Sequence, residues 1–130
     1  MHKSIHILIL EDVASDADLI EFELMEAGFD FIPKRAKDEK EFLRALDEFS
    51  PDLILSDYDL PQYTGVLALA EAKVRFPEVP FILITGALDK DPKRVGEILA
   101  GGASDYVLKD RIDQLASAVH SALCFDHGVQ

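Results

Sequence analysis

The sequence predicts an α/β fold, with one doubly wound, five-stranded parallel sheet and five helices on both of its faces. Short aliphatic runs alternate along the chain with segments of helical periodicity, and turn residues or helix caps mark each change. The connections are short, which favours parallel strands joined by right-handed crossovers. Because 130 residues is a usual length for one domain, we expect residues 1–130 to fold around a single core.

The first strand is expected at Ile5–Leu10, because a nearly continuous aliphatic run is typical of a strand buried on both faces. Ser15 is the predicted N-cap of the first helix, and Gly28 is the residue that ends it. The core-facing residues of this helix are expected to be Leu19, Ile20, Leu24 and Ala27. A second strand at Phe31–Ala36 contains Pro33, which cannot donate a backbone hydrogen bond and therefore places the strand at a sheet edge.

The middle of the chain continues the alternation. Asp38 and Glu41 form a capping box for the second helix. Its apolar face holds Phe42, Leu43, Leu46 and Phe49. The third strand is expected at Leu53–Ser56, and the loop after it contains Pro61, which cannot continue a strand interior. The third helix is predicted from Val66 to about Phe76.

The last third of the chain repeats the pattern twice. The fourth strand is expected at Phe81–Ile84, and Asp91 and Pro92 are the predicted N-cap and first residue of the fourth helix. Gly101 ends that helix, and the fifth strand follows at Asp105–Leu108. The inward-facing residues of the fourth and fifth helices are expected to be Val95, Ile98, Leu99, Ile112, Leu115, Ala116, Val119 and Leu123.

Charge and composition exclude several classes of function. Thirteen Lys and Arg against 25 Asp and Glu give a net charge of −12, which repels a phosphate backbone, so we predict no direct binding of nucleic acid. No apolar run approaches the roughly eighteen residues needed to cross a bilayer, and the first apolar run is too short for a secretory signal. We therefore expect a cytoplasmic protein that does not bind membranes. Cys124 is the only cysteine, so no internal disulfide forms.

Five side chains with chemical potential stand where the predicted strands end. Ligands of open parallel sheets bind outside the carboxyl ends of the strands. Glu11 and Asp12 follow the first strand, Asp57 the third, Thr85 the fourth and Lys109 the fifth. Each alone fits an ordinary turn, cap or solvated residue, but that explanation requires five coincidences at corresponding strand ends. If the first, third and fourth strands are neighbours, the five side chains face one crevice.

The three carboxylates of this set predict a metal site. Clustered carboxylates repel one another, and a hard cation neutralises them. Oxygen ligands select magnesium, calcium or manganese rather than zinc, and the sequence has no His or Cys spacing typical of zinc. We predict magnesium.

These residues resemble the receiver domains of bacterial two-component response regulators, the CheY-like superfamily, over roughly residues 6–122. No single motif is specific, but the ordered set is. The set consists of the acidic pair Glu11-Asp12, Asp57 in LILSDYDLP, Gly65, Thr85 in ILITG, and Tyr106 with Lys109 in GGASDYVLKD. The resemblance implies a flavodoxin-like strand order of 2-1-3-4-5.

The resemblance also implies a function in phosphorelay signal transduction. Asp57 would accept a phosphoryl group from the phosphohistidine of a sensor histidine kinase or a histidine phosphotransfer protein. Asp12 and Asp57, with the main-chain carbonyl of Asp59, would bind magnesium directly, and Glu11 would assist through water. The protein would catalyse its own phosphorylation and dephosphorylation without being a conventional turnover enzyme.

The remaining family residues imply a switch. Lys109 and Thr85 would contact the phosphoryl oxygens, and movement of the Thr85 hydroxyl would let Tyr106 rotate. The rotation would change a surface read by a downstream output protein or domain. One departure is Asp110, which stands where the family often has a proline with a cis peptide bond. A cis bond costs about 2.5–4 kcal/mol before a residue other than proline, so we expect the loop after Lys109 to have a different shape.

Three other interpretations of these residues compete with this one. Asp57-Tyr58-Asp59 resembles the nucleophile motif of haloacid-dehalogenase-type phosphatases, but that motif usually follows the first strand and leaves the acidic pair unexplained. A flavin-binding module of similar topology does not fit, because the loop EDVASD lacks a phosphate cradle rich in Ser, Thr and Gly. The serious alternative is a receiver-like interaction module that acts without phosphorylation, which detection of an acyl phosphate would distinguish.

Overall fold

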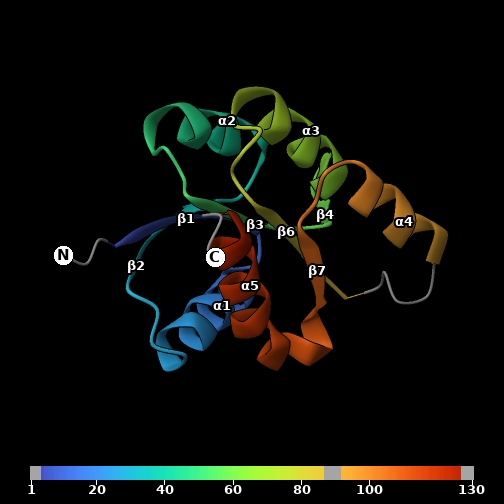
Figure 1. Ribbon diagram of the computed structural model, residues 1–130. Coiled ribbons are helices and arrows are strands. Elements are labelled where there is room, and N and C mark those ends of the chain that lie inside the picture. Colours follow the sequence, from blue (N-terminus) through green and yellow to red (C-terminus); the bar gives the residue numbers. More distant parts are fainter. Residues whose placement is uncertain (1–3, 87–91, 127–130) are drawn as a thin grey trace.

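The computed structural model describes residues 4–86 and 92–126 (Figure 1). Five strands form the main sheet: β1 (Ile5–Leu10), β2 (Phe31–Ala36), β3 (Leu53–Asp57), β6 (Phe81–Thr85) and β7 (Asp105–Leu108). The α-helices are α1 (Ala14–Glu26), α2 (Glu39–Glu48), α3 (Gly65–Arg75), α4 (Pro92–Ala100) and α5 (Leu115–Asp126). A 3-10 helix, η2 (Lys109–Gln114), links β7 to α5. None of the described helices combines the length and apolar composition that crossing a membrane requires.

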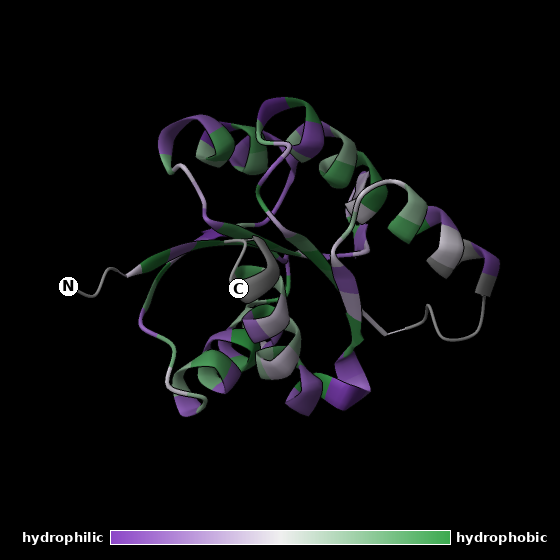
Figure 2. Ribbon diagram, viewed as in Figure 1, coloured by the Kyte–Doolittle hydropathy of each residue, from purple (hydrophilic) through white to green (hydrophobic). Residues whose placement is uncertain are grey.

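The predicted architecture is confirmed. The strands are parallel and lie in the order β2-β1-β3-β6-β7, so β2 is an edge strand as the proline in it predicted. Helices α1 and α5 cover one face of the sheet, and α2 and α3 cover the other (Figure 1). Two clusters of buried apolar side chains fill these layers, one on each face of the sheet. Apolar residues accordingly line the strands and the inner sides of the helices, while hydrophilic residues face outward (Figure 2).

Strand boundaries follow the sequence closely, and the small differences concern polar residues. β1, β2 and β7 have the predicted bounds, whereas β3 and β6 each extend one residue further, to Asp57 and Thr85. Both added residues are buried, with 9% and 2% of their surface exposed. The backbones of these two polar residues are therefore fixed by pairing within the sheet rather than by the loops that follow.

Several helix details were predicted wrongly. Helix α1 begins at Ala14 after Val13, so Ser15 lies inside the helix and is not its N-cap. Its buried stripe is Ala17, Ile20 and Leu24. Leu19 is 41% exposed, because it does not fall on that stripe of i, i+3 and i+7. Ala27 continues the spacing of the stripe but lies at the surface, because α1 ends at Glu26 and Ala27 is its C-cap. In α4, Ile98 is buried but Leu99 is 43% exposed.

Other caps are confirmed. The Asp38 side chain accepts a hydrogen bond from the Glu41 N–H at 2.9 Å, although Glu41 reaches back to the N–H of Lys37 rather than to that of Asp38. Gly28 ends α1 with a φ of +89°, a conformation that favours glycine. Asp91 lies outside the described residues, as do the side chains of Val95 and Cys124.

The connection from β3 to α3 contains a feature that the sequence did not reveal. β4 (Asp59–Leu60) and β5 (Tyr63–Thr64) form a short antiparallel hairpin, and the Thr64 side chain then caps α3. Gly65 follows, and its N–H donates to the carbonyl of Tyr58 at 2.7 Å. A Cβ at Gly65 would collide with the Leu83 side chain and lie 2.7 Å from the Asp57 carbonyl oxygen. Gly65 is therefore required for the close return of the chain past Asp57.

We predict that Gly65→Ala lowers the free energy of unfolding by about 1–3 kcal/mol, because overpacking at this site forces the backbone of Asp57 to shift. Gly96→Ala is the matched control, since a Cβ at Gly96 meets nothing within 4 Å. In α4 that change should be neutral or stabilising by up to about 1 kcal/mol. Urea denaturation measures both. Equal midpoints for the two variants would contradict the packing role of Gly65.

Candidate functional site

Three carboxylates meet at the carboxyl edge of the sheet. Glu11 and Asp12 follow β1, Asp57 ends β3, and these two strands are hydrogen-bonded neighbours. One carboxylate oxygen from each of the three residues lies within 4.8 Å of the others. Glu11 and Asp57 are buried and Asp12 is exposed. The structure thus brings together the acidic residues that the sequence singled out.

Asp57 is held rigidly. Its Oδ1 accepts a hydrogen bond from the N–H of Tyr58 at 2.7 Å, and the Ser56 hydroxyl donates to its carbonyl at 2.8 Å. Burial raises the pKa of the Asp57 carboxyl, and hydrogen bonds and the charge of Lys109 only partly offset that rise. Burial also raises the pKa of Glu11, and the nearby charge of Asp57 adds to the effect. The buried pair therefore favours any neighbour that brings positive charge.

Lys109, at the start of η2, provides such a charge. Its Nζ lies 3.1 Å from Glu11 Oε1, 3.3 Å from Asp57 Oδ2 and 2.8 Å from Asp16 Oδ2. Burial alone would lower the pKa of Lys109, but the hydrogen bond with Asp16 and the charges of Asp57 and Glu11 raise it overall. Sequence reasoning missed Asp16. Its position in the first turn of α1, at the same edge of the sheet, was the available signal.

The Lys109–Asp110 peptide bond is trans, as are all described peptide bonds. The chain turns into η2 at this point. The loop is therefore shaped without the cis proline that the family often has, as the sequence led us to expect.

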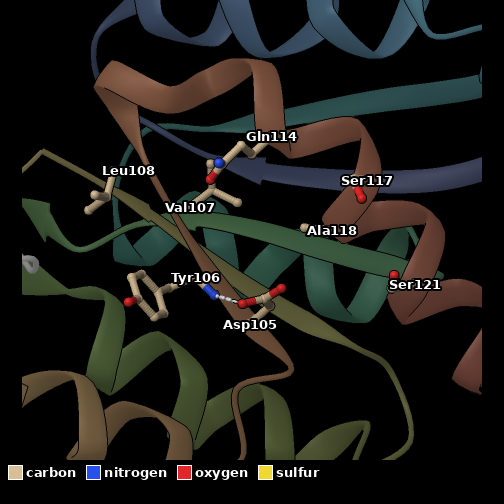
Figure 3. Close-up of a pocket in the computed structure, with 8 residues that line it drawn as sticks. All are labelled: Asp105, Tyr106, Val107, Leu108, Gln114, Ser117, Ala118 and Ser121. Atoms are coloured by element: carbon tan, nitrogen blue, oxygen red, sulfur yellow. Dashed lines mark hydrogen bonds between the residues drawn. The ribbon is translucent and has the colours of Figure 1, made fainter.

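Thr85 ends β6 at the same edge, and Tyr106 lies in the neighbouring strand β7, paired in register with Leu83. Thr85 follows Ile84, which pairs in register with Asp57, and is itself buried. Tyr106 is partly buried and packs against the apolar cluster under α2 and α3, while Val107 packs into the opposite cluster, so the two side chains leave β7 on opposite faces (Figure 3). A groove of about 440 Å³ runs between β7 and α5 beside them, away from the carboxylates.

The acidic cluster has the chemistry of a site for a hard cation. All donors are carboxylate oxygens, which magnesium, calcium and manganese prefer. Glu11 Oε1 is buried and lies 3.1 Å from the ammonium of Lys109. Lys109 shares its single charge among Glu11, Asp57 and Asp16, so the acidic residues that it contacts outnumber it, which favours a further cation.

The family is decided by comparison with known proteins. A model of the response regulator receiver domain matches residues 7–120. The chain belongs to this family. Receiver domains are signalling modules of two-component systems rather than conventional enzymes, so the sequence-based assignment is confirmed.

Individual relatives agree. Transcriptional regulatory protein CitT of Bacillus subtilis is 35% identical over 106 residues, which cover 81% of this chain and 46% of CitT. Two-component response regulator ORR8 of Oryza sativa subsp. japonica is 31% identical over 109 residues, which cover 80% of this chain and 85% of ORR8. The crystal structure of a response regulator receiver domain protein from Clostridium thermocellum matches with a TM-score of 0.83 at 25% identity, covering 97% and 99% of the two chains. The receiver described here spans about half the length of transcriptional regulators such as CitT.

We predict that magnesium raises the thermal stability of the receiver, because folding forces the carboxylates together and a cation bound only to the folded form relieves their repulsion. At a hundredfold excess over the dissociation constant the gain is about 2.7 kcal/mol, or several degrees in melting temperature. Asp12→Ala removes one ligand and one repelling charge, so it should raise stability without metal and reduce the magnesium increment. Differential scanning calorimetry measures both effects.

Two controls isolate the site. Sodium chloride at matched ionic strength reports general screening of the net charge of −12. Asp113→Ala removes an exposed acid elsewhere and should keep the full magnesium increment. Equal increments in Asp12→Ala and in the wild type, above the salt control, would place the metal elsewhere.

Proposed function

We propose that this receiver transmits a signal by accepting a phosphoryl group on Asp57 in a magnesium-dependent reaction. The donor would be the phosphohistidine of a sensor histidine kinase or of a histidine phosphotransfer protein. The observation that supports this most is the setting of Asp57. It is a buried carboxylate at a strand end, with two acidic residues within metal-binding distance and an ammonium at 3.3 Å. A nucleophile, a cation site and a fixed positive charge are the parts that phosphoryl transfer requires.

The transfer is a displacement at phosphorus. A carboxylate oxygen of Asp57 forms the new P–O bond while the P–N bond to the imidazole breaks, and the electron pair leaves with the ring nitrogen. The departing imidazole is neutral because its other ring nitrogen carries a proton. The product is an acyl phosphate. The hydrogen bond from the Tyr58 N–H fixes the carboxylate at Oδ1 and so orients the group for attack.

The surrounding side chains would stabilise the charge of the phosphoryl oxygens. Lys109 is near enough to move from the carboxylate to the phosphoryl group, and Thr85 would donate a hydrogen bond from its hydroxyl. Magnesium, when bound by Asp12, Asp57 and the carbonyl of Asp59, would supply further positive charge at this point. Glu11, the buried member of the acidic pair, would hold water in its coordination shell.

Phosphorylation would be read at the edge of the sheet near β7. Thr85 pairs in register with Leu108, so a displacement of its hydroxyl toward the phosphoryl group acts directly on the strand that carries Tyr106. Rotation of the tyrosine would alter the surface of α4, β7 and α5. The partner that reads this surface, a downstream protein or a further domain of a longer chain, stays a prediction, as does a cytoplasmic location.

We predict that the receiver gains one phosphoryl group when it is incubated with magnesium and phosphoramidate, and that Asp57→Asn abolishes the gain because the amide is not a nucleophile. Intact-mass spectrometry at neutral pH measures the addition. Asp52→Asn, which changes an exposed acid just before β3, is the matched control and should be phosphorylated. Undiminished phosphorylation of Asp57→Asn would remove that residue from its role. A wild type that stays unmodified would favour the interaction module that acts without phosphorylation.

A second prediction separates chemistry from switching. Thr85→Ala should leave phosphorylation of Asp57 largely intact, because the hydroxyl contacts the product and does not supply the nucleophile. It should weaken the response of Tyr106, followed by NMR of the tyrosine ring. An equal response of Tyr106 in Thr85→Ala and wild type would show that the hydroxyl does not couple the two sites.

A further inference from the structure

The ammonium of Lys109 has a partner outside the acidic cluster. Asp16, in the first turn of α1, accepts a hydrogen bond from Lys109 Nζ at 2.8 Å, within the usual range of 2.7–2.9 Å for charged pairs. The bond to Asp57 Oδ2 is longer, at 3.3 Å, and Glu11 Oε1 lies at 3.1 Å from the same nitrogen. By distance, the principal partner of Lys109 is therefore Asp16.

This contact matters because the ammonium of Lys109 and a divalent cation compete for the same carboxylate oxygens. A lysine that paired fully with Asp57 and Glu11 would occupy the oxygens that a divalent cation needs and would repel the cation. Asp16 is only partly exposed, at 37% of its side chain, and stands at the mouth of the site beside a small pocket of about 70 Å³ lined by apolar residues of α1 and η2. It can therefore hold the ammonium to one side of the carboxylates.

We propose that Asp16 is a positioning residue: its carboxylate on α1 competes with Asp57 for the ammonium of Lys109 and so sets where that ammonium lies. In the resting protein Asp16 draws the ammonium toward α1, which weakens the contacts of Lys109 with Glu11 and Asp57 and so favours the binding of magnesium by the carboxylates. During phosphoryl transfer it competes with the phosphoryl group for the same ammonium. The first statement concerns metal binding alone, and the second rests on the proposed function.

The two statements predict opposite effects of Asp16→Asn. Without the Asp16 charge, Lys109 pairs more closely with Asp57 and Glu11, which it already contacts. The dissociation constant for magnesium then rises roughly three- to tenfold, as expected for one partly exposed charge pair. At saturating magnesium, however, the maximal rate of phosphorylation by phosphoramidate rises severalfold, because the competing acceptor is gone. Damage to the fold would lower both affinity and rate. Isothermal titration with magnesium chloride and rapid-quench mass spectrometry measure the two quantities.

Two further variants test that the effect passes through Lys109. Asp16→Asn should raise the dissociation constant for magnesium by a factor that is at least threefold smaller in a Lys109→Met background than in the wild type. The reason is that the Lys109→Met variant has no ammonium for Asp16 to position. Asp16→Glu keeps a carboxylate and should restore most of the wild-type affinity. Asp18→Asn removes the same charge two residues away, from a carboxylate bonded to Arg35, and should leave affinity and rate unchanged.

The outcomes separate the ideas. An unchanged magnesium affinity in Asp16→Asn, or an equal loss with and without Lys109, overturns the positioning role of Asp16. A lower maximal rate in Asp16→Asn overturns the competition. If the wild type itself takes no phosphoryl group at Asp57, the proposed function fails, while the magnesium titrations still decide whether Asp16 positions Lys109.

Discussion

At the carboxyl edge of the sheet, acidic side chains outnumber the one ammonium that contacts them among the described residues, and the rest of the structure depends on this excess of negative charge. Glu11 and Asp57 are buried there, and Asp12 and Asp16 stand close by. Lys109 contacts Glu11, Asp57 and Asp16. Buried carboxylates that share one ammonium are costly, because burial and mutual repulsion both disfavour their charged forms. The edge therefore favours positive charge, and its three carboxylates could hold a metal ion.

The rest of the fold makes that imbalance tolerable. β3 lies in the centre of the sheet, all its residues are buried, and apolar clusters pack on both of its faces. Such packing holds Asp57 in place against repulsion from its neighbours, since close-packed cores resist small displacements. The β4–β5 hairpin and Gly65 then return the chain directly past Asp57. The packing of the core thus keeps the repelling carboxylates close together, and such fixed placement of charges is what a preorganised site requires.

β1, β3 and β6 could be predicted from the sequence because a strand buried on both faces leaves a continuous aliphatic run. The same physical reason explains why the predicted β3 and β6 stopped one residue short: Asp57 and Thr85 are buried but polar, so hydrophobicity alone ends the strand before them. Helix faces were harder. Leu19 and Leu99 are apolar yet exposed, and where a helix carries more apolar residues than it buries, periodicity cannot choose among them.

The site was predictable to the extent that its residues stand at strand ends. The topology rule collects all such ends at one edge, so Glu11, Asp12, Asp57 and Lys109 could be placed together from their positions along the chain. Asp16 could not, because its importance comes from a contact with a residue 93 positions later in the chain. Its place in the first turn of α1 puts it near this edge, but the sequence does not show that it contacts Lys109.

The Asp16 contact also changes how the site is connected to the rest of the receiver. Lys109 follows directly after β7, the strand that carries Tyr106, and its ion pair with Asp16 ties this end of the strand to α1. Under the proposed function, an ammonium that turns to a phosphoryl group must weaken its bond to α1. By linkage, the free energy by which the Lys109–Asp16 ion pair affects phosphorylation equals the free energy by which phosphorylation affects that ion pair.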